Sequence, residues 1–422
     1  MSAKYLVLIL DGASGWPREE WGGQTSLERA HTPNLNRLAR EGVTGLVDNV
    51  PEGMEPSSAV ACMSVMGFDP AMYYCGRGPI EAMALGIELE PGEVAMRCNL
   101  VTVLGEHMVS YSAGDIPSHE AKLLVDTLRK EVIAAFNDRS KQPRLGLHAG
   151  VGFRNILTVK EGQDLLATRF TPPHDITGQE VAQYGPSGPG SHLVNELTER
   201  SKAVLACHPV NKSRVSRGLL PATQIWLFWP GMKPGRVPLF ADVYGGRKAA
   251  VSSGVDLLRG LAMLTGMDVL SIPGVTDGVD NDYYAQMAGA LAALQDYDVV
   301  FVHVEAPDAA AHAGDPDAKL RAIEQIDALM LPQVFAWVDK HGTGSANADS
   351  GYELSVLALC DHPTPLAIRT HVAEPVPFVL WGPQFQANGA SDFSEKTARA
   401  TGLVVTPGWT LMAWFLGGRV CT

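Results

Sequence analysis

Two short segments near the C-terminus carry residues whose types suit metal chemistry. Together they supply carboxylate and imidazole groups at Asp308, His312, Asp361, His362 and His371. Asp308 and His312 are four residues apart, so on a helical turn they lie on one face and can share an ion. Each segment directly follows an apolar run that is typical of a strand. Oxygen and imidazole donors without thiolates favour manganese, zinc or cobalt and suit magnesium less well, so the pattern predicts divalent-metal sites at the rim of a sheet.

Asp11 has the same setting as these residues. It ends the apolar run 5–10, which predicts a buried parallel strand that delivers an acid at its carboxyl end. A lone Asp-x-x-x-His is common on helix surfaces, and each segment taken singly is better explained as structural. Four places, at Asp11, 308–312, 361–362 and 371, fall just past predicted strands, and this coincidence favours a metal centre.

A phosphoryl-transfer site with two metals also needs a nucleophile. Ser57 and Ser58 follow Pro56 at the predicted start of a helix, where free N–H groups and the helix dipole suit a phosphate. A serine at this place is often only the N-cap. We expect Ser57 to be the cap and Ser58 to be the nucleophile, with the pair Thr25-Ser26 as the weaker alternative.

The elements that must position these residues alternate between strands and helices. Apolar runs predict strands at 5–10, 43–50, 93–103, 153–159, 225–228, 269–272, 299–304, 355–359 and 376–380. Helical patterns cover 121–136, 248–263 and 318–331, and Thr32-Pro33 predicts a further helix start, with Thr32 as N-cap. This alternation predicts an α/β fold with a doubly wound, mostly parallel sheet.

The chain of 422 residues is longer than one compact core usually holds. The α/β rhythm is interrupted in the middle, so we expect residues 1–90 and 232–422 to form the metal-binding domain. Residues 91–231 are expected to form a smaller, inserted α+β domain that closes over the substrate. A cleft between the two domains is the expected substrate site.

Composition narrows the function classes. A net charge of −13 argues against nucleic-acid binding and against an anionic membrane surface as a partner. It does not exclude a small phosphorylated substrate, because metal ions and buried arginines reverse the local field. The six cysteines form no C-x-x-C pair, there is no secretory signal, and no apolar run is as long as a membrane span, so we expect a cytoplasmic protein with reduced thiols.

The order of these motifs resembles the alkaline phosphatase superfamily. The motifs are Asp11-Gly12, Pro56-Ser-Ser58, Asp308-x-x-x-His312, Asp361-His362-x-Thr-Pro and His371. Nearly end to end, the chain resembles more closely the archaeal-type cofactor-independent (2,3-bisphosphoglycerate-independent) phosphoglycerate mutases. This likeness rests on further motifs that include Thr32-Pro-Asn-Leu, Gly76-Arg-Gly-Pro-Ile-Glu, Arg97-Cys-Asn-Leu-Val-Thr, Tyr111-Ser-Ala-Gly, Pro172-Pro-His-Asp-Ile and His208-Pro-Val-Asn.

The resemblance implies an alkaline phosphatase-like catalytic domain, a phosphoserine intermediate at Ser58 and exchange of 3-phosphoglycerate with 2-phosphoglycerate. It implies two divalent ions, with manganese favoured and zinc, cobalt or magnesium as alternatives. One ion would be held by Asp11, Ser58, Asp361 and His362, and the other by Asp308, His312 and His371. The implied substrate-binding residues are Arg77, Arg97, Arg154, His174, Asp175 and Lys248.

The chain departs from that family at positions expected to face the substrate: Ala59, Cys62, Asp115 and Asn155. Every implied metal ligand is present. Polar groups discriminate steeply between related substrates, so a second hypothesis is a paralogue with the same chemistry on another phosphorylated or phosphonate-type substrate. A third is a non-catalytic regulatory protein that retains the fold. His303 and most other histidines receive no role.

Overall fold

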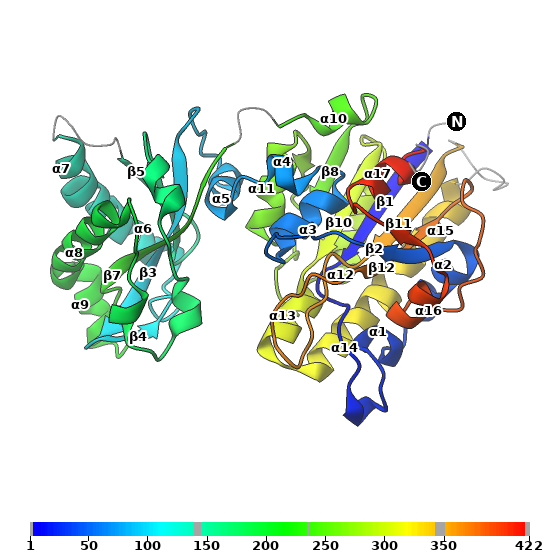
Figure 1. Ribbon diagram of the computed structural model, residues 1–422, viewed down its shortest axis with the longest axis horizontal. Coiled ribbons are helices and arrows are strands. Elements are labelled where there is room, and N and C mark those ends of the chain that lie inside the picture. Colours follow the sequence, from blue (N-terminus) through cyan, green and yellow to red (C-terminus); the bar gives the residue numbers. More distant parts are fainter. Residues whose placement is uncertain (1–2, 139–144, 234–236, 342–350, 418–422) are drawn as a thin grey trace. The chain divides into compact units, whose positions relative to one another are not determined.

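The computed structural model describes residues 3–138, 145–233, 237–341 and 351–417. The chain divides into two compact units, of which the first combines Met1–Tyr74 with Val237–Thr422 and the second is Cys75–Arg236. The sequence placed these boundaries after residues 90 and 231. The first boundary falls earlier in the structure because α5 (Arg77–Ala84) packs against strands of the second unit (Figure 1).

The first unit is built on a sheet of eight strands among the described residues. Their order across the sheet is β13 (Val404–Val405), β2 (Val43–Val47), β12 (Val376–Trp381), β11 (Glu353–Leu359), β1 (Ala3–Leu10), β10 (Val299–Val304), β8 (Ala249–Ser252) and β9 (Asp268–Val269). Most neighbours pair in parallel, and β12 runs antiparallel to β11 and β2. The predicted mostly parallel α/β sheet is confirmed.

The neighbouring inner strands β1 and β10 are buried along nearly their whole length, which requires cover on both faces of the sheet. That cover comes from helices between the strands (Figure 1). They are α1 (Ser26–Arg29), α2 (Pro33–Glu41), α3 (Ser58–Val65), α4 (Pro70–Tyr73), α10 (Phe240–Val243), α11 (Asp256–Leu264), α12 (Tyr283–Ala293), α13 (Ala306–Ala313), α14 (Pro316–Gln325), the π-helical turn η6 (Ile326–Met330), α15 (Leu331–His341), α16 (Glu395–Ala400) and α17 (Thr410–Phe415).

The helix predicted over 248–263 is wrong in its first part. Ala249–Ser252 is the strand β8, and the helix α11 begins only at Asp256. All four residues of β8 are buried. A short apolar run that is buried on both sides has no alternating pattern, so periodicity did not distinguish it from the start of a helix.

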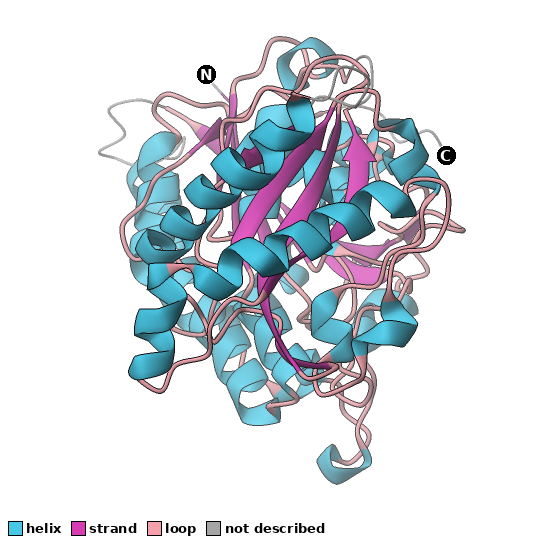
Figure 2. Ribbon diagram, turned by 90° about the vertical axis from the view of Figure 1, so that its left-hand side faces the viewer, coloured by secondary structure: helices cyan, strands magenta, loops and turns pink. Residues whose placement is uncertain are grey.

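The second unit contains an antiparallel sheet. Its strands follow the order β4 (His107–Ser110), β3 (Val94–Leu104), β6 (Arg154–Val159) and β5 (Leu145–His148), and β7 (Gln224–Met232) also pairs with β3. Long helices lie across one face of this sheet (Figure 2). They are α6 (Ser118–Leu128), which continues through the π-helical turn η2 (Arg129–Ile133) into α7 (Ala134–Asn137), and α8 (Ser191–Cys207); α9 (Pro209–Ser216) follows.

The two faces of strand β3 have different partners. Val94, Met96 and Cys98 belong to the apolar core under α6 and α8. Ala95 points the other way and packs with Ala82 of α5. Because side chains alternate along a strand, Arg97 lies on the α5 face. The sequence of β3 therefore places a charged residue on the face that α5 covers.

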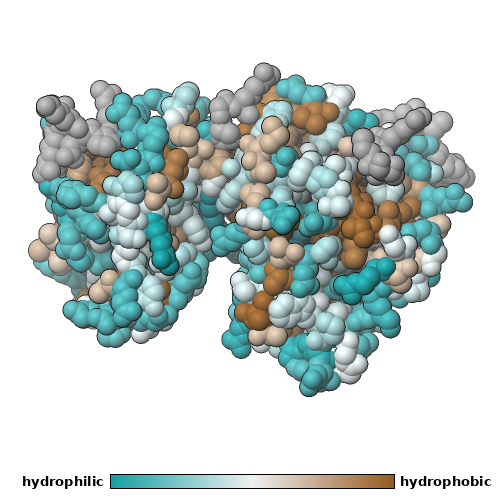
Figure 3. All heavy atoms as spheres, viewed as in Figure 1, coloured by the Kyte–Doolittle hydropathy of each residue, from teal (hydrophilic) through white to brown (hydrophobic). Residues whose placement is uncertain are grey.

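The surface is mainly hydrophilic in the view of Figure 3, with apolar residues in small scattered groups. Among the described residues, none of the helices combines the length and apolar character that a membrane span requires. Both observations agree with the charged fraction of 19% in the sequence.

The start of α2 gives a prediction about stability. Thr32 precedes the helix as expected, but its side chain makes no capping hydrogen bond. The buried carboxylate of Asp327 accepts the N–H of Asn34 at 3.0 Å and that of Leu35 at 2.7 Å instead. We expect Asp327→Ala to lower the free energy of unfolding by about 2–3 kcal/mol, because it orphans these donors.

Thr32→Val is the matched control for this prediction. Removal of a working threonine cap costs about 1 kcal/mol, whereas we expect a loss below about 0.5 kcal/mol here. Urea unfolding measures both variants. Equal losses would show that Asp327 is not the cap of α2.

Candidate active site

The ligand-bearing segments meet at one edge of the first unit's sheet. Asp11 directly follows β1, Asp308 lies in α13 just after β10, and Asp361 follows β11. These three strands are neighbours and run in parallel, with Leu10 opposite Val304. The carboxyl ends of parallel strands share an edge, which is where open α/β sheets bind ligands. The structure therefore brings together residues that are far apart in the sequence.

The first group of ligand atoms surrounds His362. Its Nε2 lies 3.1 Å from Asp361 Oδ2 and 3.7 Å from Asp11 Oδ1. The Oγ of Ser58 is 3.1 Å from the same nitrogen. Ser58 is the first residue of α3, and Ser57 is its N-cap, with the Ser57 hydroxyl accepting the Val60 N–H at 3.4 Å. One hydroxyl, two carboxylates and one imidazole thus converge on a small volume.

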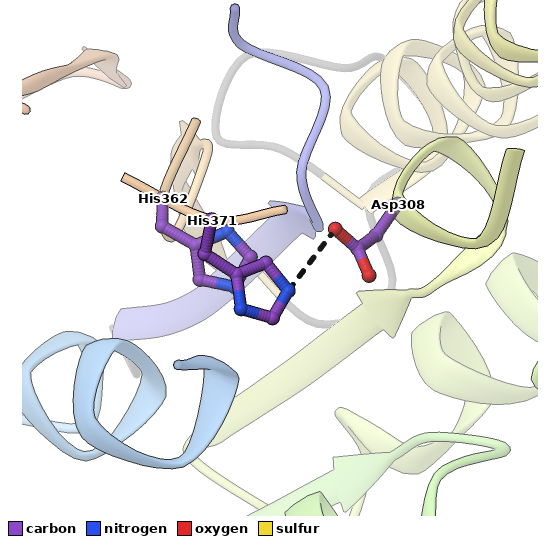
Figure 4. A group of neighbouring side chains, drawn as sticks. All are labelled: Asp308, His362 and His371. Carbon is purple, nitrogen blue, oxygen red and sulfur yellow. Dashed lines mark ion pairs between the residues drawn. The ribbon is translucent and has the colours of Figure 1, made fainter. Parts of the chain in front are cut away.

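The second group surrounds Asp308. His312 Nε2 lies 3.1 Å from Asp308 Oδ2, and His371 Nε2 lies 3.6 Å from Asp308 Oδ1. The rings of His362 and His371 lie side by side, and the His371 ring points toward the Asp308 carboxylate (Figure 4). His362 therefore offers a possible ligand atom close to both groups. It lies with Asp11 and Asp361 in the first group and with Asp308 and His371 in the second. The resemblance assigned it to the first group alone.

The electrostatics of the first group fit a bound cation. Burial raises the pKa of Asp11 well above its usual range, and the charges of Asp361 and Asp308 raise it further. Burial and the charge of Asp11 do the same to the pKa of Glu305. Asp11 Oδ1 and Glu305 Oε2 are buried without a hydrogen-bond partner among the described residues. Burial lowers the pKa of His362, which favours a neutral imidazole with a free lone pair. This donor set suits a divalent ion.

Asp308 is held in its charged form by its neighbours. Burial would raise its pKa, but hydrogen bonds from His312 and His371 hold that pKa well below the usual range. The bond to Asp308 also raises the pKa of His312 to about 9. Thr364 donates its hydroxyl proton to Asp308 Oδ1 at 2.5 Å. The carboxylate is thus oriented and ionised before any ligand binds.

Four further residues contact the site, and sequence reasoning missed them as functional. His303, which received no role, is fully buried, with Nε2 at 2.7 Å from Asp11 Oδ2 and Nδ1 at 3.0 Å from Ser253 Oγ. Its position as the one polar residue inside the apolar strand β10 was an available signal. Thr364 lies within the motif Asp361-His362-x-Thr-Pro and Glu305 lies three residues before Asp308, but neither received a role of its own. The fourth residue is Cys62.

Cys62 lies one helical turn after Ser58. Its thiol donates to Asp361 Oδ2 at 3.7 Å. Burial raises the pKa of this thiol well above its usual range, and the charges of Asp361 and Asp11 add to the effect. The thiol is therefore a neutral donor to a carboxylate of the first group, at one of the positions where the sequence departs from the family that it resembles.

Three of the expected substrate residues gather in the second unit. Glu81 of α5 accepts from Arg77 at 2.7 Å and also pairs with the buried Arg97. Arg97 donates to Asn99 Oδ1 at 3.0 Å. Arg154 lies on β6, opposite Asn99. Burial is the largest influence that lowers the pKa of Arg97, and the charge of Arg154 lowers it further. One carboxylate thus orients two guanidinium groups beside a third.

His174 and Asp175 belong to the same surroundings. The centroid of the His174 ring is 5.4 Å from that of Trp229, and the Arg77 guanidinium lies over the Trp229 ring at 4.1 Å from its centroid. His174 and Asp175 form an exposed pair at 3.6 Å. The Trp229 ring system therefore contacts both His174 and Arg77. The backbone of Trp229 has a positive φ of 50°.

Lys248 does not join the other candidates. It precedes β8 and lies at the amino edge of the parallel strands, whereas the ligands lie at the carboxyl edge. The resemblance alone implied Lys248, and its place before β8 separates it from the carboxylate–imidazole cluster. Thr25-Ser26 is not near the ligands as a nucleophile either: Thr25 forms a capping box with Glu28 at the start of α1 and donates to Glu395.

A mostly parallel α/β sheet with a serine and a carboxylate–imidazole cluster at its carboxyl edge is typical of metal-dependent enzymes. Comparison with known proteins identifies the family within this class. A family model described as 2,3-bisphosphoglycerate-independent phosphoglycerate mutase matches residues 39–211. A protein of that name from Methanothrix thermoacetophila is 41% identical over 98% of this chain and 100% of its own. A Geobacter sulfurreducens protein named as a probable enzyme of this kind is 38% identical over 98% and 99%.

Solved structures agree with this match. The PH0037 protein from Pyrococcus horikoshii is 26% identical, covers 99% of this chain and 98% of its own, and superposes with a TM-score of 0.78. A cofactor-independent phosphoglycerate mutase from Thermoplasma acidophilum shares the fold at 24% identity and a TM-score of 0.60, over 98% of this chain and 99% of its own. The chain belongs to the family of 2,3-bisphosphoglycerate-independent phosphoglycerate mutases, as its motifs predicted.

Gly12 gives a prediction about the geometry of the site. Its φ is +57°, and a Cβ there would lie 2.4 Å from Asp308 Oδ1 and 2.7 Å from Thr364 Oγ1. Gly12→Ala must therefore push Asp308 away from the Asp11 turn. We expect Mn²⁺ affinity, measured by titration calorimetry, to fall at least about tenfold.

Gly22→Ala is the matched control, since Gly22 has a φ of +66° but no atom within 4 Å of the added Cβ. It carries the backbone strain of about 1–2 kcal/mol without the steric contact. Unchanged Mn²⁺ affinity in Gly12→Ala would contradict the close packing of Gly12 on Asp308.

Proposed function

We propose that the protein interconverts 3-phosphoglycerate and 2-phosphoglycerate through a phosphoserine at Ser58. The observation that carries the proposal is the position of Ser58 Oγ, at the start of α3 and 3.1 Å from His362 Nε2 within the ligand cluster. Relatives that align over nearly the whole chain at 38–41% identity bear the name of this mutase. A different substrate or a non-catalytic role is not favoured.

The ligand clusters are proposed to hold two divalent ions, with manganese favoured over zinc, cobalt and magnesium. Asp11, Ser58, Asp361 and His362 would hold one ion, and Asp308, His312 and His371 the other, with His362 close to both. When bound, the ions would offset the acidic charge and stabilise negative charge on phosphoryl oxygens. The unpartnered Asp11 Oδ1 and the neutral imidazole of His362 support this assignment.

The chain's own groups suit the proposed transfer. The bond between phosphorus and the C3 oxygen breaks while a bond to Ser58 Oγ forms, and the serine proton ends on the released C3 hydroxyl. The reverse transfer then places the phosphoryl group on the C2 oxygen. The start of α3 presents free backbone N–H groups toward Ser58, which stabilise a bound phosphoryl group.

Glycerate must remain bound while it turns between the two transfers. The arginines of the second unit supply forked donors that fit a carboxylate or a phosphate. Arg77, Arg97 and Arg154, with His174 and Asp175, are proposed to bind the substrate. The second unit is proposed to close during turnover and keep water from the phosphoserine.

The places of the four departures from the family in the structure give little support for a different substrate. Asn155 is buried at 1% exposure, and its amide bonds to Gly150 N–H and to the Phe153 carbonyl. These two bonds give Asn155 a local structural role. Cys62 contacts Asp361, and Ala59 is buried in α3. Of the four positions, Asp115 alone is exposed.

The proposed reaction is tested with 3-phosphoglycerate and Mn²⁺, with 2-phosphoglycerate detected through enolase. We expect turnover by the wild-type protein, its loss on metal removal by EDTA, and its recovery with Mn²⁺. Ser58→Ala should lower kcat by about 10³-fold or more, because it removes the nucleophile. Ser57→Ala should lower stability by about 1 kcal/mol and leave activity largely intact.

Two results would contradict the proposal. Absence of 2-phosphoglycerate formation by folded, Mn²⁺-loaded wild-type protein would exclude this substrate. Full activity of Ser58→Ala would exclude the phosphoserine at that residue.

Glu81 tests the role of the arginines. We expect Glu81→Gln to raise KM for 3-phosphoglycerate about tenfold with a smaller change in kcat, because it releases Arg77 and Arg97 from their fixed orientation. Glu120→Gln is the matched control: Glu120 also pairs with two arginines of the second unit, Arg214 and Arg217. Equal KM values for the two variants would show that the Glu81 pair is only structural.

A further inference from the structure

We infer that Lys319 is a positioning residue that fixes the two ligand-bearing turns of the metal centre relative to each other. This inference rests on the metal centre proposed above. Lys319 is fully buried in α14, and its Nζ donates to the Ser14 carbonyl at 3.1 Å and to the Thr364 carbonyl at 2.9 Å. A buried ammonium group with two carbonyl partners is costly to place, so a specific role is expected.

The two carbonyls belong to the turns that carry metal ligands. Ser14 is three residues after Asp11, and Thr364 is two residues after His362. The turns also contact each other, because the Thr364 N–H donates to the Ser14 carbonyl at 3.1 Å. Lys319 therefore holds one oxygen from each turn at the point where the two turns meet.

The third ligand-bearing segment is joined to the same point. The Thr364 hydroxyl donates to Asp308 Oδ1. Asp308 lies in α13, and Lys319 lies in the following helix, α14, which packs against α13. One lysine thus connects the segments that carry Asp11, His362 and Asp308.

Glu395 holds the Asp11 turn from another direction. Its carboxylate accepts from the Ser14 hydroxyl at 2.8 Å, from the Gly15 N–H at 3.1 Å and from the Thr25 hydroxyl at 2.7 Å. Burial lowers the pKa of Lys319 to about 8, and the charges of Asp308 and Glu395 oppose that shift. Lysine charge and acid charge therefore lie on either side of the Ser14 backbone.

The direction in which metal affinity changes distinguishes a positioning role of Lys319 from a purely electrostatic one. A positive charge near a cation site repels the cation, so its removal should tighten binding if charge alone mattered. Loss of the two carbonyl contacts should instead loosen the ligand turns and weaken binding. Lys319→Met keeps a side chain of similar length but has neither charge nor donors.

Lys4→Met is the matched control. Lys4 is also buried, donates to the Tyr297 carbonyl at 2.9 Å, and lies in β1 at the edge of the sheet opposite Asp11. Titration calorimetry with Mn²⁺ on the full chain, together with thermal unfolding, measures both variants. We expect Lys319→Met to weaken Mn²⁺ binding about 10- to 100-fold, and Lys4→Met to change it by less than about twofold while it also loses thermal stability.

Unchanged or tighter Mn²⁺ binding in Lys319→Met would overturn the inference and leave the metal centre intact. Equal weakening in both lysine variants would also overturn it, because a general loss of stability would then explain the result. If Lys319→Met does not fold, Lys319→Gln, which retains one donor, is measured under the same criteria. Absence of Mn²⁺ binding by the wild-type protein would instead contradict the proposed metal centre itself.

Discussion

The repulsion among acids at the carboxyl edge of one parallel sheet is the constraint on which the rest of this structure depends. Strands β1, β10 and β11 end side by side, and they deliver Asp11, Asp308 and Asp361 to one buried place. Burial and mutual repulsion raise the pKa of Asp11. Hydrogen bonds from His312 and His371 offset the charge of Asp308, whereas Asp11 Oδ1 has no hydrogen-bond partner among the described residues, so we infer that a divalent cation completes the cluster.

Much of the surrounding structure holds these acids in place against that repulsion. Asn49 donates to the Asp361 carbonyl at 2.9 Å, the Gly12 N–H donates to Asp361 Oδ1 at 3.1 Å, and His303 Nε2 lies 2.7 Å from Asp11 Oδ2. Thr364 and Lys319 connect the turns behind the ligands. Second-layer contacts of this kind commonly set ligand orientation and metal affinity. The fold thus stores a preformed, negatively charged site beside the Ser58 hydroxyl.

The sequence predicted the sheet and the residues that the structure brings together at its carboxyl edge, because both have local signals. An apolar run followed by an acid marks Asp11, and the four-residue spacing marks Asp308 and His312. Contacts that depend on tertiary packing had no such signal: the pairing of His303 with Asp11, the carbonyl contacts of Lys319, and the cap of α2 by the distant Asp327. The wrong helix at 248–263 has a related origin, because full burial of β8 removes the alternation that identifies a strand.

The central claim is that cations occupy the carboxyl edge of the sheet beside Ser58. A crystal of the full-length protein grown with Mn²⁺ and measured at the manganese absorption edge tests it most directly. We predict two anomalous peaks, one within ligand distance of Asp11, Asp361 and His362 and the other beside Asp308 and His371. Anomalous density elsewhere, with none at these residues, would contradict the account.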